Sequence, residues 1–232
     1  SPFGQRAPND CGHDRRIGRG RALLIVSSAV GPGLATSELV TFAGAVLAGG
    51  ESRRMGSDKA FVTISGVAMV TRAVQALVTA GATPVIVVGG DAPRLEELGL
   101  PQIADEFPGE GPLGGIISAL GHFASREEPV DAVVILACDL VSPSDAAVRS
   151  VTAAMDDPAV DVVLPVVEDH AQWLHAAWRV RTLDSLAADF SSGVRAPRYA
   201  VGKLNVQMIR GEDSTWFRDA DHPEDLPRCT GS

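Results

Sequence analysis

Glycines and basic side chains cluster directly after the short apolar run 44–47. Gly49 and Gly50 follow that run, and Arg54 and Lys59 come within the next nine residues. Glycines at the end of a strand let the backbone approach a ligand and leave N–H groups free to donate to phosphate oxygens. Guanidinium and ammonium groups neutralise phosphate charge. We therefore predict a triphosphate site here. The alternative, a solvated surface loop, leaves the clustering of glycines and bases unexplained.

A carboxylate stands at the end of the most apolar segment of the chain. Residues 130–137 are almost all apolar, and Cys138 and Asp139 follow them directly. An aspartate in that place lies at the rim of a sheet, and Mg²⁺ is commonly held by one or two carboxylates together with phosphate oxygens. We expect Asp139 to bind Mg²⁺. The alternative role, capping of the next helix, suits Ser142 better. We expect Cys138 to be a small core residue, since no histidine is near it in the sequence.

A third candidate segment joins an acidic loop to several glycines. Asp105 precedes residues 109–115, Gly-Glu-Gly-Pro-Leu-Gly-Gly, which contain the G-x-G-x-x-G pattern of dinucleotide-binding folds. That pattern should follow the first strong strand of such a fold, whereas here it follows a weak one. We therefore expect a glycine-rich loop that admits a base and its sugar, rather than an NAD site.

The elements that position these residues alternate between strand and helix. Short apolar runs predict the strands, and apolar residues three and four apart predict the helices. We expect Gly81 to cap the first helix, Ser142 to cap the third, and Pro165 to mark the outer end of the last strand. This order predicts one α/β domain, a three-layer, mostly parallel sheet with helices on both faces, whose ligands bind beyond the carboxyl ends of the strands. The predicted strands are 44–47, 84–88, 130–137 and 161–167, and the predicted helices are 69–78, 113–123 and 143–155.

The composition excludes several other classes of protein. The chain has 232 residues, of which 45% are hydrophobic and 21% charged, which is typical of a globular protein. Its net charge of −9 gives no general basic surface for nucleic acid, and no apolar run is long enough to cross a membrane. Three scattered cysteines favour neither a disulfide framework nor a zinc site, and they indicate a cytoplasmic setting.

Residues 1–42 differ from the rest of the chain. They carry five arginines, four of them just before the apolar stretch 22–30, an order that mimics a secretory signal. We expect residues 1–42 to be a disordered or spurious extension, with a targeting or tethering segment as the alternative. The predicted domain then spans residues 43–227, and residues 228–232 form a tail.

Residues 47–59, Leu-Ala-Gly-Gly-Glu-Ser-Arg-Arg-Met-Gly-Ser-Asp-Lys, resemble the signature loop of the molybdenum cofactor guanylyltransferases, which belong to a wider group of nucleotidyltransferases. Residues 111–115 are similar to the family's Gly-Pro-Leu-Ala-Gly, and Cys138-Asp139 to its Cys-Asp-x-Pro. Residues 172–179 and 219–226 are similar to two later motifs of the family. The resemblance covers roughly the whole predicted domain.

The resemblance implies a Rossmann-like nucleotidyltransferase that transfers GMP from GTP to molybdenum-loaded molybdopterin and releases pyrophosphate. It implies Mg²⁺ as cofactor, and we add transient contact with molybdoenzymes or other cofactor-synthesis proteins as a further expectation. We assign catalysis to Arg54, Lys59 and Asp139, with Asp139 on the metal. The expected nucleotide contacts are Leu47, Ala48, Gly49, Gly50, Lys59, Asp105, Gly111, Pro112, Leu113 and Asp139, and the candidate acceptor contacts are Gln172, Arg195, Asp219 and Asp221.

Departures from the family's pattern leave alternatives open. Asp219 and Asp221 stand where the family has asparagines, and two carboxylates would repel an anionic pterin phosphate. Surface solvation explains Arg195 as well as a phosphate contact does. A related enzyme that uses CTP or another phosphorylated acceptor is one alternative function. A non-catalytic nucleotide-binding accessory protein is another.

Overall fold

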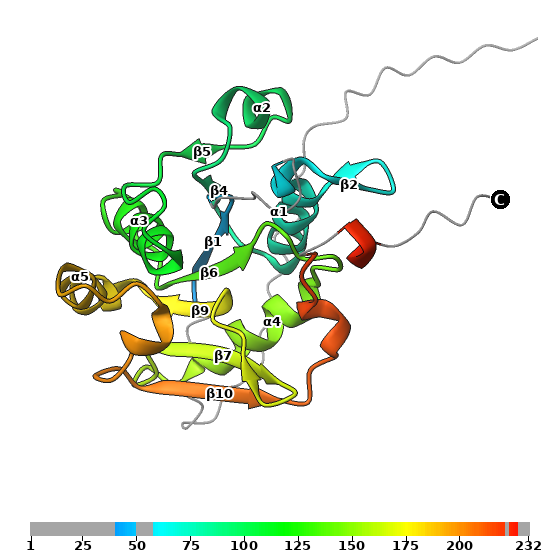
Figure 1. Cartoon of the computed structure of the whole chain (residues 1–232). Helices are drawn as coiled ribbons and strands as arrows, with labels where there is room; N and C mark the ends of the chain where they lie inside the picture. The colour runs from blue at the N-terminus through cyan, green and yellow to red at the C-terminus, as the bar shows by residue number, and fades with distance from the viewer. Residues whose placement is uncertain (1–39, 50–57, 221–222, 227–232) are drawn as a thin grey trace, which may run out of the picture. The chain divides into compact units, whose positions relative to one another are not determined.

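A computed structural model describes residues 40–49, 58–220 and 223–226 of the chain. Its main sheet has the order β10-β7-β9-β6-β1-β4-β5, with β8 paired to β7, as Figure 1 shows. A two-stranded hairpin of β2 (Thr63–Ile64) and β3 (Val67–Ala68) lies outside this sheet. The strands of the main sheet are β1 (Phe42–Leu47), β4 (Val85–Val88), β5 (Gln102–Ile103), β6 (Ala132–Ala137), β7 (Val162–Val167), β8 (His170–Ala171), β9 (His175–Arg179) and β10 (Val206–Arg210).

In the main sheet four of the seven strand pairs are parallel, which agrees with the predicted, mostly parallel sheet. Strand β1 runs parallel to β4 and to β6, with Leu47 opposite both Val88 and Ala137. The pairs β4–β5 and β7–β10 are also parallel. Strand β9, which the sequence analysis did not predict, runs antiparallel between β6 and β7, so that these two strands point the same way. The carboxyl ends of β1, β4, β6 and β7 therefore meet at one edge of the sheet.

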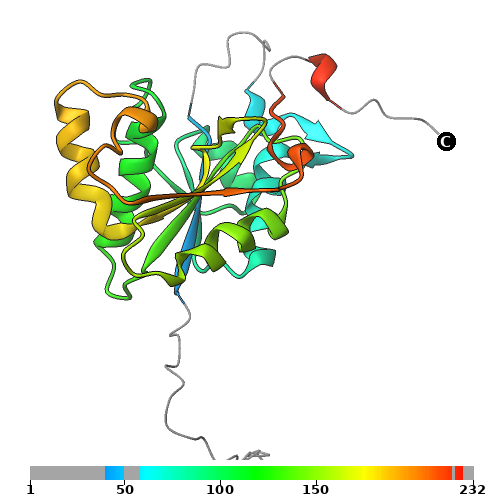
Figure 2. The same cartoon turned by 90° about the horizontal axis from the view of Figure 1, so that it is seen from below.

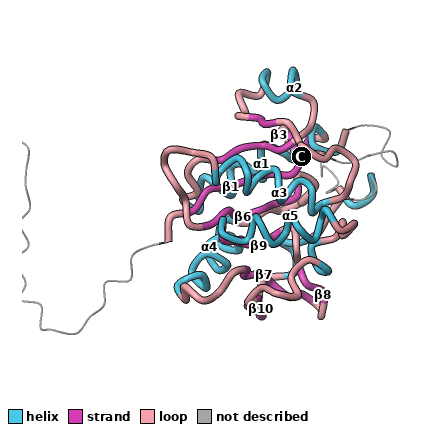
Figure 3. The backbone as a smooth tube through the Cα atoms, turned by 90° about the vertical axis from the view of Figure 1, so that its left-hand side faces the viewer, coloured by secondary structure: helices cyan, strands magenta, loops and turns pink. Residues whose placement is uncertain are grey.

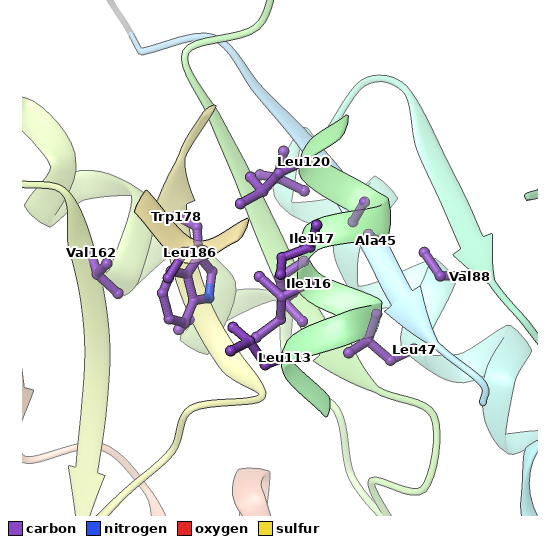
Figure 4. Close-up of a cluster of buried hydrophobic side chains, with 14 of the residues drawn as sticks. Ala45, Leu47, Val88, Leu113, Ile116, Ile117, Leu120, Val162, Trp178 and Leu186 are labelled. Atoms are coloured by element: carbon purple, nitrogen blue, oxygen red, sulfur yellow. The ribbon is translucent and has the colours of Figure 1, made fainter. Parts of the chain in front are cut away.

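Helices cover both faces of the sheet, which confirms the predicted three layers. Helices α3 (Pro112–Ala124) and α5 (Leu183–Ser191) pack on one face, and α1 (Met69–Ala80) and α4 (Asp145–Ala153) on the other (Figures 2 and 3). Because strand side chains alternate between faces, β1 contributes to two buried cores. Figure 4 shows Leu113, Ile116 and Leu120 of α3 beside Ala45 of β1 and Trp178 of β9. The short helix α2 (Ala92–Glu97) connects β4 to β5.

Of the two predicted helix caps, the one at α1 is confirmed and the one at α4 is wrong. Gly81 caps α1 with φ of 104°, a left-handed conformation that glycine adopts without strain, as predicted. The predicted cap of α4 was wrong by two residues, because Ser144 rather than Ser142 accepts hydrogen bonds from the N–H groups of Ala146 and Ala147. An N-cap oxygen must reach the free N–H groups of the first turn, and the turn begins only at Asp145.

Pro165 does not mark the outer end of β7, as the sequence analysis predicted. It lies inside the strand, opposite Ile209 of β10. On the other side of β7, the pairing with β9 covers Val162 and Val163, and the pairing with β8 covers residues 166 and 167. Pro165 falls between these two ladders, at a place where a residue without an N–H group is tolerated.

The C-terminal segment, residues 213–220, packs against the carboxyl end of β6. The N–H of Ala220 donates to the carbonyl of Asp139 at 3.0 Å, and the N–H of Val141 donates to the carbonyl of Arg218 at 2.9 Å. Leu140 and Asp219 form an antiparallel bridge between these two bonds. Residues remote in sequence thus fix the backbone around Asp139. None of the helices in the described ranges is long and apolar enough to span a bilayer.

The imidazole of His175 is buried beneath this C-terminal segment. Its ring centroid lies 4.7 Å from that of Phe217, and its residue is only 2% exposed. Within the described part of the chain, neither ring nitrogen has a hydrogen-bond partner. Burial lowers the pKa of His175 to about 3, so the folded protein holds a neutral imidazole. His175 belongs to the interior.

We expect His175 to make the stability of the protein fall as the pH drops below about 6.5. Its pKa is lower in the folded than in the unfolded chain, so the unfolded chain takes up the proton first and gains about 1.4 kcal/mol per pH unit. Urea unfolding at pH 6.5 and 5.0 measures this slope. In a His175→Leu variant the loss should be about 2 kcal/mol smaller over that interval. In a His170→Leu control, the slope should equal that of the wild type, because His170 is exposed.

Candidate active site

A cavity of about 610 Å³ opens at the edge where the parallel strands end. Its walls come from six segments of the chain: the ends of β1, β4 and β6, the region around Lys59, the segment from Asp105 to the start of α3, and Leu174 just before β9. Its lining residues are Leu47, Ala48, Gly49, Lys59, Val88, Asp105, Gly109, Gly111, Pro112, Gly115, Ala137, Cys138, Asp139 and Leu174. All three segments singled out from the sequence therefore contribute to one site.

Two opposite charges meet at this cavity. The Nζ atom of Lys59 lies 3.3 Å from Oδ2 of Asp139, and the two side chains are 14% and 24% exposed. Lys59 begins the short 3₁₀ helix η1 (Lys59–Phe61), whose cap is Asp58, accepting from the N–H of Ala60. Asp139 follows β6 directly. The pairing holds an ammonium group and a carboxylate side by side where phosphate groups and a cation would need them.

Asp105 is oriented by protein groups before any ligand binds. One carboxylate oxygen, Oδ1, accepts from the N–H of Phe107 at 2.9 Å and from the hydroxyl of Ser118 at 3.1 Å. The other, Oδ2, lies next to Gly49, where an added Cβ would come within 3.3 Å of it. Ser118 is a residue that sequence reasoning missed. Its signal was a hydroxyl on the apolar face of the predicted helix 113–123.

The ends of β1 and β4 approach each other so closely that they need glycine. Gly89 has φ of 72°, and a Cβ built on it would lie 3.3 Å from the Cα of Gly49. A side chain there would strain the backbone and press on Gly49, which lines the cavity. This explains why glycine follows β4 at position 89.

The metal ligands that the cavity offers suit a cation that also binds phosphate oxygens of a nucleotide. In the described ranges no three His, Cys, Asp or Glu side chains are grouped as a closed metal site. Asp139 offers a hard oxygen ligand of the kind that Mg²⁺ prefers, and phosphate oxygens and water would have to complete its octahedral shell. Burial and the neighbouring Asp139 raise the pKa of the Cys138 thiol, which stays protonated and therefore serves as neither a thiolate ligand nor a nucleophile.

Other predicted site residues lie away from the cavity lining. The side chain of Leu113 is buried in the core between α3 and the sheet (Figure 4). Gln172 donates to the carbonyl of His170, and Arg195 pairs with Glu110. Asp219 bridges to Leu140 through its backbone. Leu174 lines the cavity, although the sequence analysis had not selected it. Gly50, Arg54 and Asp221 lie outside the described residues.

A mostly parallel sheet whose carboxyl edge carries glycines, an ammonium group and a carboxylate around one cavity defines an α/β nucleotide-binding enzyme. Comparison with known proteins gives the family. A family model described as a MobA-like NTP transferase domain matches residues 44–202, and the chain belongs to this family of nucleotidyltransferases.

Named relatives and a solved structure agree with this family. The molybdenum cofactor guanylyltransferase of Rhodobacter capsulatus is 36% identical over 197 residues, covering 81% of this chain and 94% of that protein. A probable molybdenum cofactor guanylyltransferase of Opitutus terrae is 50% identical over 78 residues, which are 34% of this chain and 39% of that protein. The crystal structure of molybdopterin-guanine dinucleotide biosynthesis protein A from Archaeoglobus fulgidus shares the fold. Its TM-score is 0.65 at 22% identity, covering 79% of this chain and 94% of that one.

The close approach of Gly89 to Gly49 gives a prediction with a matched control. Gly99 has a similar φ of 67°, but an added Cβ there meets nothing within 4 Å. Gly89→Ala and Gly99→Ala should each lower the unfolding free energy by about 1–2 kcal/mol, because both place a side chain at positive φ. Only Gly89→Ala should also weaken nucleoside triphosphate binding, by about fivefold, in isothermal titration calorimetry. Equal binding by the two variants would show that the contact with Gly49 does not shape the site.

Proposed function

We propose that this enzyme transfers GMP from GTP to molybdopterin carrying molybdenum, forming the guanine dinucleotide of the cofactor and releasing pyrophosphate. Two kinds of observation support the proposal. The relatives that cover most of the chain are named molybdenum cofactor guanylyltransferases. The observation that carries most weight is the Lys59–Asp139 pair at 3.3 Å beside Gly49 in a cavity of about 610 Å³. This is a volume typical of small-molecule sites.

The charges around the cavity suit the transfer of GMP from GTP to the terminal phosphate of the acceptor. An oxygen of the acceptor's terminal phosphate attacks the α-phosphorus of GTP, a P–O bond forms, and the bond to the β-phosphate breaks as pyrophosphate leaves. The attacking oxygen is already anionic near neutral pH, so no strong general base is needed. What the protein must supply is alignment and neutralisation of charge, which dominate catalysis of phosphoryl-type transfer.

We assign these tasks to particular residues. Lys59 donates to the β- and γ-phosphate oxygens and stabilises the charge that develops on pyrophosphate, with Arg54 as its partner in that role. The backbone from Leu47 to Gly50 approaches the phosphates, since glycine there leaves N–H groups unobstructed. Asp105 accepts from the guanosine portion, and Gly111 and Pro112 line the space for it. Asp139 is the residue that would hold Mg²⁺, which when bound neutralises phosphate charge and orients the α-phosphate.

For the acceptor, molybdopterin, we propose candidate contact residues without assigning each one a separate task. Gln172, Asp219 and Asp221 are our candidates for its contacts. The retained Lys59–Asp139 pair favours catalysis over a purely accessory role, because nucleotide binding alone does not require a metal carboxylate. We place the reaction in the cytoplasm, where the product would pass to molybdoenzymes or other cofactor-synthesis proteins by transient contact.

Removing either member of the charged pair should abolish most turnover. We expect Lys59→Ala and Asp139→Ala each to lower kcat for guanylyl transfer by about 10² to 10³, the usual effect of losing one preorganised charge. Pyrophosphate release from GTP and molybdopterin measures this, and circular dichroism checks that both variants remain folded. Lys203→Ala is the control, because Lys203 is 78% exposed and lies 4.0 Å from Asp189. Near-normal turnover in either site variant would overturn the assignment.

The identity of the base is tested independently of turnover. A ligand that binds only the folded protein raises its melting temperature according to ln(1 + [L]/Kd). With Mg²⁺ present, GTP should raise the melting temperature of the wild type more than CTP or ATP at the same concentration. A larger shift with CTP would favour the cytidylyl alternative.

A further inference from the structure

The guanidinium group of Arg195 is already engaged by other protein atoms. Its Nη1 atom donates to the carbonyl of Phe190 at 2.7 Å and to that of Val194 at 3.0 Å. Its Cζ atom stands 4.1 Å from the centroid of the Phe190 ring, within the range of a cation–π contact. Because these contacts orient the side chain, holding one further partner requires little additional loss of side-chain freedom.

That further partner lies between two residues that line the cavity, although it does not line the cavity itself. The Nη2 atom of Arg195 lies 2.7 Å from Oε2 of Glu110. Glu110 stands between Gly109 and Gly111, which both line the cavity, and we call residues 109–113, which run into the first turn of α3, the glycine loop. A carboxylate on this loop would repel the phosphates of a nucleotide. The pairing with Arg195 offsets part of that repulsion, because the two side chains are 42% and 48% exposed and solvent screens both charges.

The backbone of Arg195 also contacts the glycine loop. Its carbonyl accepts from the N–H of Leu113 at 3.2 Å, at the start of α3. Gly111 has φ of 92°, and a Cβ built there would lie 3.1 Å from the same carbonyl oxygen. Residue 195 therefore holds the loop through both side chain and backbone, yet it is not one of the residues that line the cavity.

A second set of contacts links Phe190, on which Arg195 packs, to Asp105. The rings of Phe190 and Phe107 pack with centroids 4.6 Å apart, and the N–H of Phe107 donates to Asp105. The segment from Asp105 to Gly111 is thus supported at one end by Ser118 and Phe107 and at the other by Arg195.

We propose that Arg195 is a positioning residue for the nucleotide: it holds the glycine loop in place and neutralises Glu110, without contacting the substrate itself. The inference rests on the proposed function, since it assumes that a nucleoside triphosphate occupies the cavity. It differs from the hypothesis drawn from the sequence, in which Arg195 binds the acceptor's phosphate.

A double-mutant cycle with kinetics tests this role. In Arg195→Ala the KM for GTP should rise about fivefold, with kcat and the KM for molybdopterin within about twofold of wild type. The loss combines a loosened loop with an uncompensated carboxylate. Adding Glu110→Gln to Arg195→Ala should therefore restore part of the GTP affinity, whereas two independent losses would add. Arg195→Lys should lie between wild type and Arg195→Ala, because it keeps the charge but loses the planar fork.

The control is Arg198→Ala. Arg198 also stacks on an aromatic ring, with its Cζ 4.6 Å from the Tyr199 centroid, and the structure gives it no contact with the glycine loop. We expect its KM for GTP to equal that of the wild type. Calorimetric titration of GTP into each variant, with Mg²⁺ present, checks the change in affinity without relying on turnover.

Each outcome separates the hypotheses. A raised KM for molybdopterin with an unchanged KM for GTP would overturn the proposal in favour of an acceptor contact. A lower melting temperature of Arg195→Ala without any change in GTP affinity would also overturn it, since Arg195 would then only stabilise the fold. If wild type binds GTP and the double variant is no better than Arg195→Ala, charge cancellation at Glu110 is refuted. If wild type binds no nucleoside triphosphate, the proposed function fails and the role of the loop fails with it.

Discussion

The register of three parallel strands is the constraint on which the rest of this site depends. Leu47 of β1 stands opposite Val88 of β4 on one side and Ala137 of β6 on the other. The residues that follow these positions therefore leave the sheet side by side, and they are the glycines and the aspartate of the cavity. A slip of one residue would turn every side chain of the slipped strand to the opposite face and separate these groups. Strand β9 is antiparallel to both of its neighbours, so β6 and β7 still point the same way and their carboxyl ends lie at the same edge of the sheet.

The local charges at the cavity differ from what the net charge of the whole chain would suggest. The chain is acidic as a whole, with a net charge of −9, yet its proposed substrates are polyanions. Two cationic side chains offset the negative charge near the cavity: Lys59 pairs with Asp139, and Arg195 pairs with Glu110. In both pairs a carboxylate close to the cavity has a cationic partner. Glycine backbone completes the lining without adding charge.

Segments distant in sequence supply the rigidity of the cavity walls. The C-terminal segment bonds to the backbone at Asp139 and covers the neutral His175. Helix α5 supplies Phe190, whose ring packs on Arg195, the partner of Glu110 in the glycine loop. Preorganised groups are effective in catalysis because they need not reorganise as the reaction proceeds. Buried apolar contacts, such as that of Phe217 with His175, are what keep these segments in place.

The sequence by itself determined the alternation of strands and helices, the strand ends at Gly49 and Asp139, and the glycine-rich loop, because each is written in local periodicity and residue type. It also selected Lys59 and Asp105, which the structure brings to the same cavity. It did not predict β9, the cap at Ser144, the interior place of Pro165, or the partners of His175, Ser118 and Arg195. These features depend on which residues lie next to one another after folding. Only the tertiary structure decides that, since a side chain's partner and its solvent exposure are set by packing between segments far apart along the chain.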